Sequence, residues 1–93
     1  MSSYAVYQIG HCIFGVGATP DAARADAGQW LDGGAEAAAA VPMYRRGQFV
    51  SGDVVVMPCS AALAKQVEAQ GGADGFMEMD GCLVTADEAE AAS

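Results

Sequence analysis

The feature that most constrains the fold is an uninterrupted apolar run, Val54-Val55-Val56-Met57, which lies between a Ser-Gly-Asp turn and Pro58. A short strand with no polar residue at either parity is typical of the middle of a sheet, where both faces are buried. A chain of 93 residues has the length of one domain. We therefore expect a single domain, residues 1–93, built around a sheet with this run as a central strand.

Further strands are indicated on both sides of the run, and their turn residues arrange them as hairpins. The Asp-Gly pair near the C-terminus is the strongest of these turn signals. Two glycines within one arm, Gly15 and Gly17, predict a bulge, a bend or a close approach of another backbone. The expected arms are 4–9 with 12–18 around Gly10-His11, 43–45 with 48–50 around Arg46-Gly47, and 76–79 with 82–84 around Asp80-Gly81.

Two main helices are expected, each with a capping residue. Thr19-Pro20-Asp21 supplies an N-cap oxygen, a proline suited to the first helical position and an acid in the first turn. This pattern predicts a helix over about residues 20–32, with Trp30 as the anchor of its inner face. Ser60 caps a second helix over about residues 60–70.

Two shorter segments complete the expected fold. Ala35–Val41 indicates a short helical turn or a linker. Thr85-Ala86-Asp87-Glu88 is a capping box that predicts a short acidic helix. The expected class is therefore α+β, an antiparallel sheet of about five strands with the two main helices packed on one face.

The charge of the chain is strongly acidic and unevenly placed. The formal net charge is −8, and from Asp53 onward there are eight acids and one base, Lys65. Such a balance repels nucleic acid and favours contact with basic surfaces. The only basic pair, Arg45-Arg46, is expected to contact a partner protein or the chain's own acids.

No set of residues has the spacing of an active site, so we expect no enzyme, cofactor or metal. Cys59, at a strand end before a helix, is the best nucleophile candidate, and a small thiol enzyme using it is one alternative. It lacks an adjacent base, because the single histidine, His11, is distant in sequence. Gly15-Val16-Gly17 does not predict a nucleotide site, because Pro20 stands where a third glycine would be needed.

The cysteine and hydropathy patterns bear on the compartment. Three cysteines without a CxxC spacing are typical of a reducing cytoplasm. No apolar run approaches the roughly 20 residues of a membrane span, and Met1-Ser2-Ser3 lacks the basic region of a signal peptide. We expect a cytoplasmic protein with no membrane contact, either a monomer or a homodimer joined by an edge strand.

The acids near the last hairpin and helix are the candidate partner-binding residues. In the expected strand 76–79, Met77 and Met79 share one face, and Phe76 and Glu78 lie on the other. The candidate residues are Asp74, Glu78, Asp80, Asp87, Glu88 and Glu90.

Two resemblances suggest functions. Gly17-Ala18-Thr19-Pro20-Asp21-Ala22, after the first hairpin, resembles the turn of HicB-type antitoxins, which implies a module that binds a basic toxin. In size, acidity, alanine content and hairpin–helix order, the whole chain is similar to small anti-defence proteins of phages and plasmids, including anti-CRISPR proteins. This second resemblance implies a non-catalytic inhibitor whose acidic surface occupies a basic nucleic-acid-binding surface of a defence complex, for example on a subunit of a CRISPR surveillance complex. The inhibitor itself would not contact nucleic acid.

Overall fold

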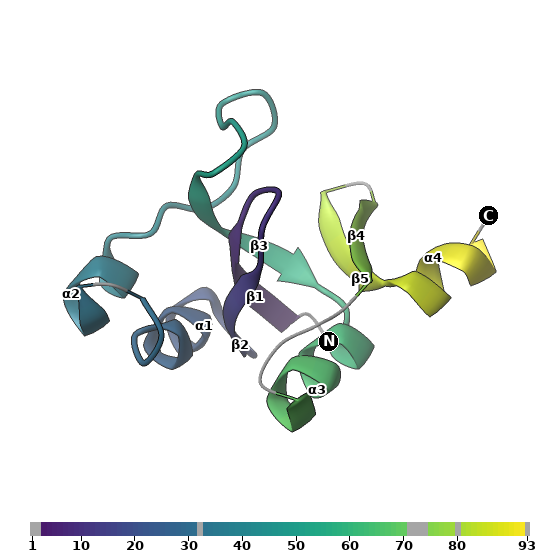
Figure 1. The fold of residues 1–93 in the computed structure, drawn as a ribbon, viewed down its shortest axis with the longest axis horizontal. Helices are drawn as coiled ribbons and strands as arrows, with labels where there is room; N and C mark the ends of the chain where they lie inside the picture. The colour runs from purple at the N-terminus through teal and green to yellow at the C-terminus, as the bar shows by residue number, and fades with distance from the viewer. Residues whose placement is uncertain (1–2, 32, 71–74, 80, 93) are drawn as a thin grey trace.

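The computed structural model describes residues 3–31, 33–70, 75–79 and 81–92, and it has an α+β fold (Figure 1). Five strands form one sheet in the order β2-β1-β3-β5-β4. The elements, in chain order, are β1 (Ser3–Gln8), β2 (Ile13–Gly17), α1 (Pro20–Ala27), α2 (Gly34–Ala39), β3 (Val54–Cys59), α3 (Ala61–Gln70), β4 (Phe76–Met79), β5 (Cys82–Thr85) and α4 (Ala86–Ala92).

The central position of β3 confirms the interpretation of the apolar run. β3 pairs antiparallel with β1 along six residues, from Ser3 opposite Cys59 to Gln8 opposite Val54. Its other side pairs in parallel with β5 at a single position, so the sheet is mixed, although mostly antiparallel. Val55, Val56 and Met57 are fully buried, as expected for a strand covered on both faces.

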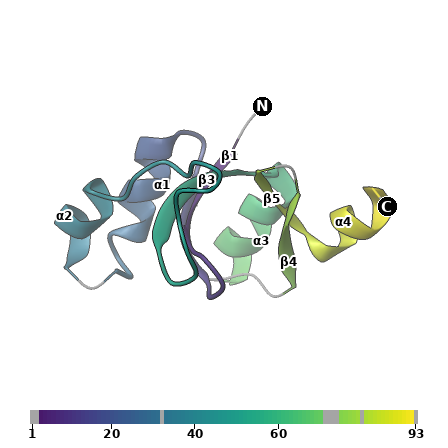
Figure 2. The ribbon, with the colours of Figure 1, turned by 90° about the horizontal axis from the view of Figure 1, so that it is seen from above.

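The helices cover opposite faces of the sheet, so the expectation that both main helices pack on one face is wrong. Alternate residues of a strand point to opposite faces. Val6 and Val56 pack with Ala23 and Ala27 of α1, whereas the residues that alternate with them pack against Leu63 and its neighbours on α3. Figure 2 shows α1 and α2 on one side of β1 and β3 and α3 on the other.

Gly15 and Gly17 let α1 lie directly against β2, which is the close approach that the sequence predicts. A Cβ atom on Gly15 would lie 2.5 Å from the backbone nitrogen of Ala27. One on Gly17 would lie 2.6 Å from the backbone nitrogen of Ala23. Both distances are shorter than real Cβ contacts, so a side chain at either position would force strand and helix apart.

α1 is shorter than expected, and this changes the place of Trp30. Thr19 caps the helix by accepting a hydrogen bond from the backbone N–H of Ala22 at 3.1 Å, as predicted. The helix ends at Ala27, however, with Gly28 as its C-cap. Trp30 follows in a turn and is 65% exposed, so it does not anchor the helix. The alanine-rich segment that follows forms α2, as one of the two expected alternatives.

The expected hairpin around Arg46-Gly47 does not form. Residues 43–45 and 48–50 contain one isolated bridge, in which Met43 lies parallel to Val56 of β3. Backbone bonds from Val56 N–H to Pro42 O and from Tyr44 N–H to Val56 O, both 2.8 Å, hold this segment beside β3. A loop follows, in which the rings of Tyr44 and Phe49 stack with centroids 6.0 Å apart.

The other turns agree with the sequence in outline. β1 and β2 form a hairpin, but its central turn residues are Ile9 and Gly10, because His11 N–H bonds to Gln8 O at 2.9 Å. Gly10 adopts a φ of +80°, which a glycine accepts readily. β4 and β5 pair as the expected hairpin, with Met79 opposite Cys82. Asp80 of its turn lies outside the described residues.

Candidate functional site

The six predicted acids do not form one cluster. Glu78 lies on β4, and Asp87 and Glu90 lie on α4, all three exposed. Asp74 and Asp80 lie outside the described residues. Glu78 and Asp87 take part in no hydrogen bond or ion pair within the described part of the chain, so their charges face solvent. These two are the acids that remain free for a partner.

Glu88 forms the capping box that the sequence predicts and an additional hydrogen bond that the sequence does not predict. Its Oε1 atom accepts hydrogen bonds from the backbone N–H of Thr85 at 3.0 Å, from Thr85 Oγ1 at 3.1 Å and from Ser60 Oγ at 2.5 Å. Thr85 Oγ1 in turn accepts from the backbone N–H of Glu88 at 3.1 Å, which completes the capping box. The hydrogen bonds from Ser60 and Thr85 hold the pKa of Glu88 below its ordinary value.

The hydrogen bond from Ser60 links the capping box of α4 to the start of α3. Ser60 also caps α3, because its Oγ accepts from the backbone N–H of Leu63 at 3.1 Å. A single carboxylate therefore joins the N-termini of α3 and α4. Local sequence patterns indicated each cap, but not that they would meet. Glu88, unlike Glu78 and Asp87, is therefore engaged in contacts within the fold.

The outer edge of β4 has backbone groups that pair with no other strand among the described residues. The carbonyl oxygen of Leu83 accepts from Ser60 N–H at 2.9 Å on the β3 side, so Leu83 points its backbone groups away from β4. In an antiparallel pair, two directly opposed residues either both direct their N–H and C=O groups toward each other or both direct them away from each other. Glu78 lies directly opposite Leu83. Glu78, and by the same alternation Phe76, therefore direct N–H and C=O away from β5. Among the described residues, no strand pairs with this edge.

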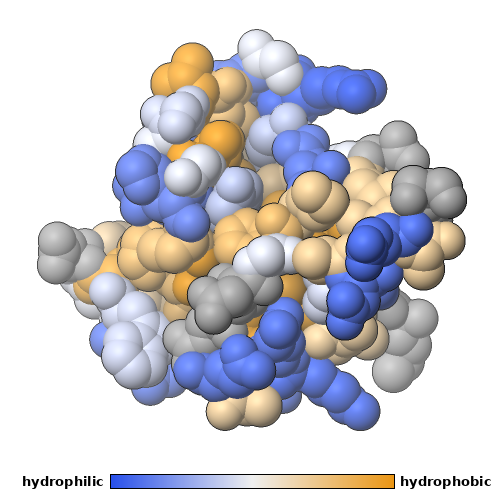
Figure 3. Space-filling view, turned by 45° about the vertical axis from the view of Figure 1, so that its right-hand side comes forward, coloured by the Kyte–Doolittle hydropathy of each residue, from blue (hydrophilic) through white to orange (hydrophobic). Residues whose placement is uncertain are grey.

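Apolar side chains lie beside this edge. Met77 is 51% exposed and shares a face with Met79, which confirms the pattern read from the sequence. On the opposite face, the ring of Phe76 meets the ring of Tyr7 edge-on at 5.4 Å, which ties the β4–β5 hairpin to β1. With the α4 side turned forward, the surface has an apolar band with hydrophilic groups above and below it (Figure 3).

The opposite edge of the sheet, β2, is closed by a side chain. Asp26 of α1 accepts a hydrogen bond from the backbone N–H of Val16 at 3.0 Å through Oδ2. Val16 lies opposite Ala5 on β1. This bond occupies a backbone donor that an added strand would need. Nothing in the local sequence pattern predicts it, because it depends on how α1 docks.

The basic pair finds no acid within the described residues. Arg45 and Arg46 are exposed, and the ion pair that forms in this part of the chain joins Arg24 to Asp21 at 3.0 Å. Arg46 and Glu78 line one hollow of about 320 Å³, together with Tyr44 and Gly81. The loop after Tyr44 and the β4–β5 hairpin therefore place one base and one acid around the same surface depression.

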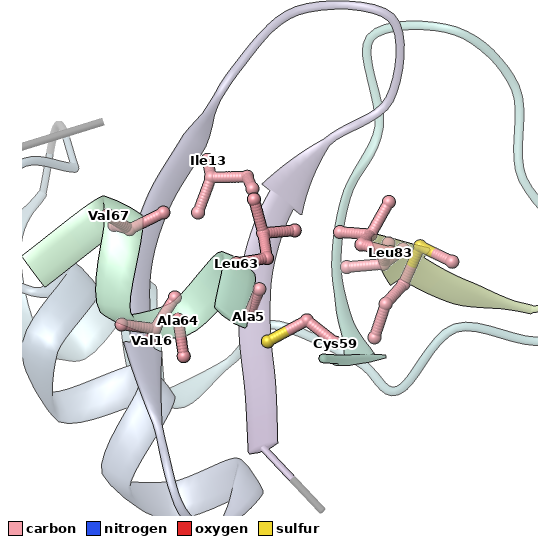
Figure 4. Close-up of a cluster of buried hydrophobic side chains, with 10 residues drawn as sticks. Ala5, Ile13, Val16, Cys59, Leu63, Ala64, Val67 and Leu83 are labelled. Carbon is pink, nitrogen blue, oxygen red and sulfur yellow. The ribbon is translucent and has the colours of Figure 1, made fainter. Parts of the chain in front are cut away.

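Cys59 lies in the core and is not poised as a nucleophile. Its side chain packs among Ala5, Leu63 and other apolar groups (Figure 4). Burial, with smaller contributions from Cys82 and Glu88, raises the pKa of the thiol from 9.0 to about 12. His11 is exposed in the β1–β2 turn. The thiolate that catalysis needs is therefore strongly disfavoured.

Within residues 3–31, 33–70, 75–79 and 81–92, no group of three or more His, Cys, Asp or Glu side chains is placed to hold a metal ion. No helix in those ranges combines the length and apolar character needed to cross a bilayer. All three cysteines are free thiols.

Comparison of the chain with family models, with curated proteins and with solved structures gives no match.

Proposed function

We propose that this chain is a non-catalytic, protein-binding inhibitor that acts through β4, β5 and α4 on a basic surface of another protein. The observation that carries the proposal is the difference between the two edge strands of the sheet, β2 and β4. Asp26 closes β2, whereas β4 offers the backbone groups of Phe76 and Glu78 beside an exposed Met77. An open edge strand is a common docking site for an extended segment of a partner.

Charge supports a basic partner rather than a second copy of this chain. Residues 66–93 contain seven acids and no base. Two copies joined at β4 would bring two such regions together, whereas a segment with Lys or Arg beside Glu78 and an apolar residue beside Met77 would complement the edge. Basic surfaces of this kind are what proteins present to nucleic acid. The proposed target is therefore a nucleic-acid-handling complex, in the manner of an anti-CRISPR protein encoded by a mobile element and active in the cytoplasm.

The experiment is a capture assay with tagged protein in lysate from bacteria that carry an active CRISPR system. The test variant is Glu78→Lys with Asp87→Lys, which reverses the two free acids and leaves the Glu88 capping box intact. The matched control is Glu36→Lys with Ala62→Lys and Gln70→Lys, which changes the net charge equally on exposed residues of α2 and α3. Circular dichroism checks that both variants fold.

We expect the wild type and the control to capture a basic nucleic-acid-binding protein that added duplex DNA releases. The test variant should lose it. Equal capture by both variants, or a captured protein that DNA does not displace, would contradict the proposal. Capture of one small basic toxin would favour the HicB-like alternative. The burial of Cys59 lends no support to the thiol-enzyme alternative.

A further inference from the structure

A second surface, remote from the acids of β4 and α4, combines two aromatic rings with two carboxylates. It is a hollow of about 200 Å³ at the β2 edge, between the end of α1 and α3. Its size suits one side chain rather than a whole drug-sized ligand. Its lining residues are Phe14, Asp26, Gln29, Trp30, Val67 and Glu68.

Of the two aromatic rings of this hollow, Trp30 is 65% exposed, whereas Phe14 is partly buried against the cluster that contains Val6 and Val56. Trp30 is the only tryptophan of the chain, and it is held in a turn by a 2.9 Å bond from its backbone N–H to Ala27 O. Neither Trp30 nor Phe14 takes part in the two ring–ring contacts of the described residues. Exposing the large apolar surface of a tryptophan to water is unfavourable in free energy, and tryptophan is enriched among the residues that dominate protein–protein binding.

The carboxylates of the hollow lack a cation. Asp26 accepts from Val16 N–H at 3.0 Å and from Gln29 Nε2 at 3.5 Å, and both donors are neutral. Glu68 is exposed and forms no ion pair among the described residues, although Lys65 lies one turn away on the same helix. None of the described residues that line the hollow is a base. Two carboxylates and two aromatic side chains therefore line the same hollow, a combination that favours a cation.

We infer that this hollow binds the guanidinium group of an arginine side chain presented by another polypeptide. A guanidinium is planar, stacks on an aromatic ring and donates paired hydrogen bonds to carboxylates, whereas an ammonium ion acts as a point charge. Trp30 and Phe14 would contact the plane, and Glu68 would accept from its edge. Because the site uses neither Glu78 nor Asp87, the inference does not depend on the proposed function.

The single tryptophan makes the test direct, because all tryptophan fluorescence reports on this hollow. The probes are three capped tripeptides, acetyl-Gly-X-Gly-amide, in which X is arginine, lysine or citrulline, the neutral isostere of arginine. The fourth probe is free arginine, which differs from the peptide by its charged amino and carboxyl groups and therefore distinguishes the free amino acid from an arginine side chain of a polypeptide. Each is titrated against the full chain at low salt while Trp30 emission is followed.

We expect a saturable change with the arginine peptide and at least about tenfold weaker binding of the citrulline peptide, because charge-assisted bonds are lost. The lysine peptide should bind more weakly than the arginine peptide. Glu68→Gln should weaken arginine-peptide binding about five- to tenfold, whereas Glu36→Gln, on α2, should leave it unchanged. No saturable change, equal binding of the citrulline peptide, no effect of Glu68→Gln, or tighter binding of free arginine than of the peptide would each overturn the inference.

Discussion

Replacing Glu88 with glutamine tests whether this acid stabilises the fold rather than binding a partner. One oxygen of Glu88 accepts three hydrogen bonds, from Ser60 and Thr85, and these join the start of α3 to the start of α4. Glutamine keeps the shape and an acceptor oxygen but removes the charge. Asp87→Asn is the matched control, because the neighbouring Asp87 is exposed and has no hydrogen bond or ion pair among the described residues.

The expected loss follows from the difference between charged and neutral acceptors. Hydrogen bonds to charged groups contribute about 1.5–3 kcal/mol and neutral ones about 1 kcal/mol. Three bonds that share one half-buried oxygen do not add fully, so we expect Glu88→Gln to lower the free energy of unfolding by about 1–2 kcal/mol. For a domain of this length that corresponds to a Tm roughly 4–16 °C lower. Asp87→Asn should change the free energy by less than about 0.5 kcal/mol.

The pH dependence provides a second signature of the same contact. Because the folded-state pKa of Glu88 lies below its ordinary value of 4.5, the stabilisation is fully present above about pH 4.5. It is lost as the pH falls through the folded-state pKa. Urea unfolding followed by circular dichroism from pH 7 to pH 3 should therefore show a gap between wild type and Glu88→Gln that narrows below pH 4.5. Equal stabilities of the two variants at pH 7, or a gap independent of pH, would refute the reasoning.

Two further predictions concern the core. Ellman's reagent should label the exposed Cys12 in the native protein but the buried Cys59 only after unfolding, and native-state labelling of Cys59 would disprove its burial. Cys59→Ser should lower the free energy of unfolding by about 1–3 kcal/mol, because it buries an unpaired hydroxyl. Gly15→Ala should lower the free energy of unfolding by about 1–3 kcal/mol, because the new Cβ would lie 2.5 Å from the Ala27 backbone nitrogen. An unchanged urea midpoint for Gly15→Ala would show that β2 and α1 do not approach so closely.

Elements with a local physical cause could be predicted from the sequence. The uninterrupted apolar run of β3, the Thr19 and Ser60 caps and the capping box at Thr85 each depend on residues a few positions apart. The placement of the two main helices was wrong, although Val54–Met57 contained the relevant signal. A strand that is apolar at both parities needs cover on both faces, so one face could not hold both helices.

The remaining differences arise from contacts distant in sequence. Helical periodicity extended α1 to Trp30, but Gly28 ends the helix, and this turns an expected core anchor into an exposed side chain. The segment after Pro42 bonds to β3 on the side where β5 also pairs, so it does not fold back on itself as a hairpin. In the candidate site, the exposure of Glu78 and Asp87 followed the expectation, whereas the engagement of Glu88 with Ser60 and the closure of β2 by Asp26 depend on helix docking.

The most direct test of the central claim compares Glu78→Pro with Glu78→Gln in the capture assay. Proline removes the outward N–H of Glu78 and leaves the ladder to β5 intact, because that N–H faces away from β5. Glutamine removes the charge alone. If a partner strand adds to β4, Glu78→Gln should retain part of the captured basic protein, and Glu78→Pro should retain none. Capture by the proline variant at the wild-type level would show that the edge of β4 is not where the partner binds.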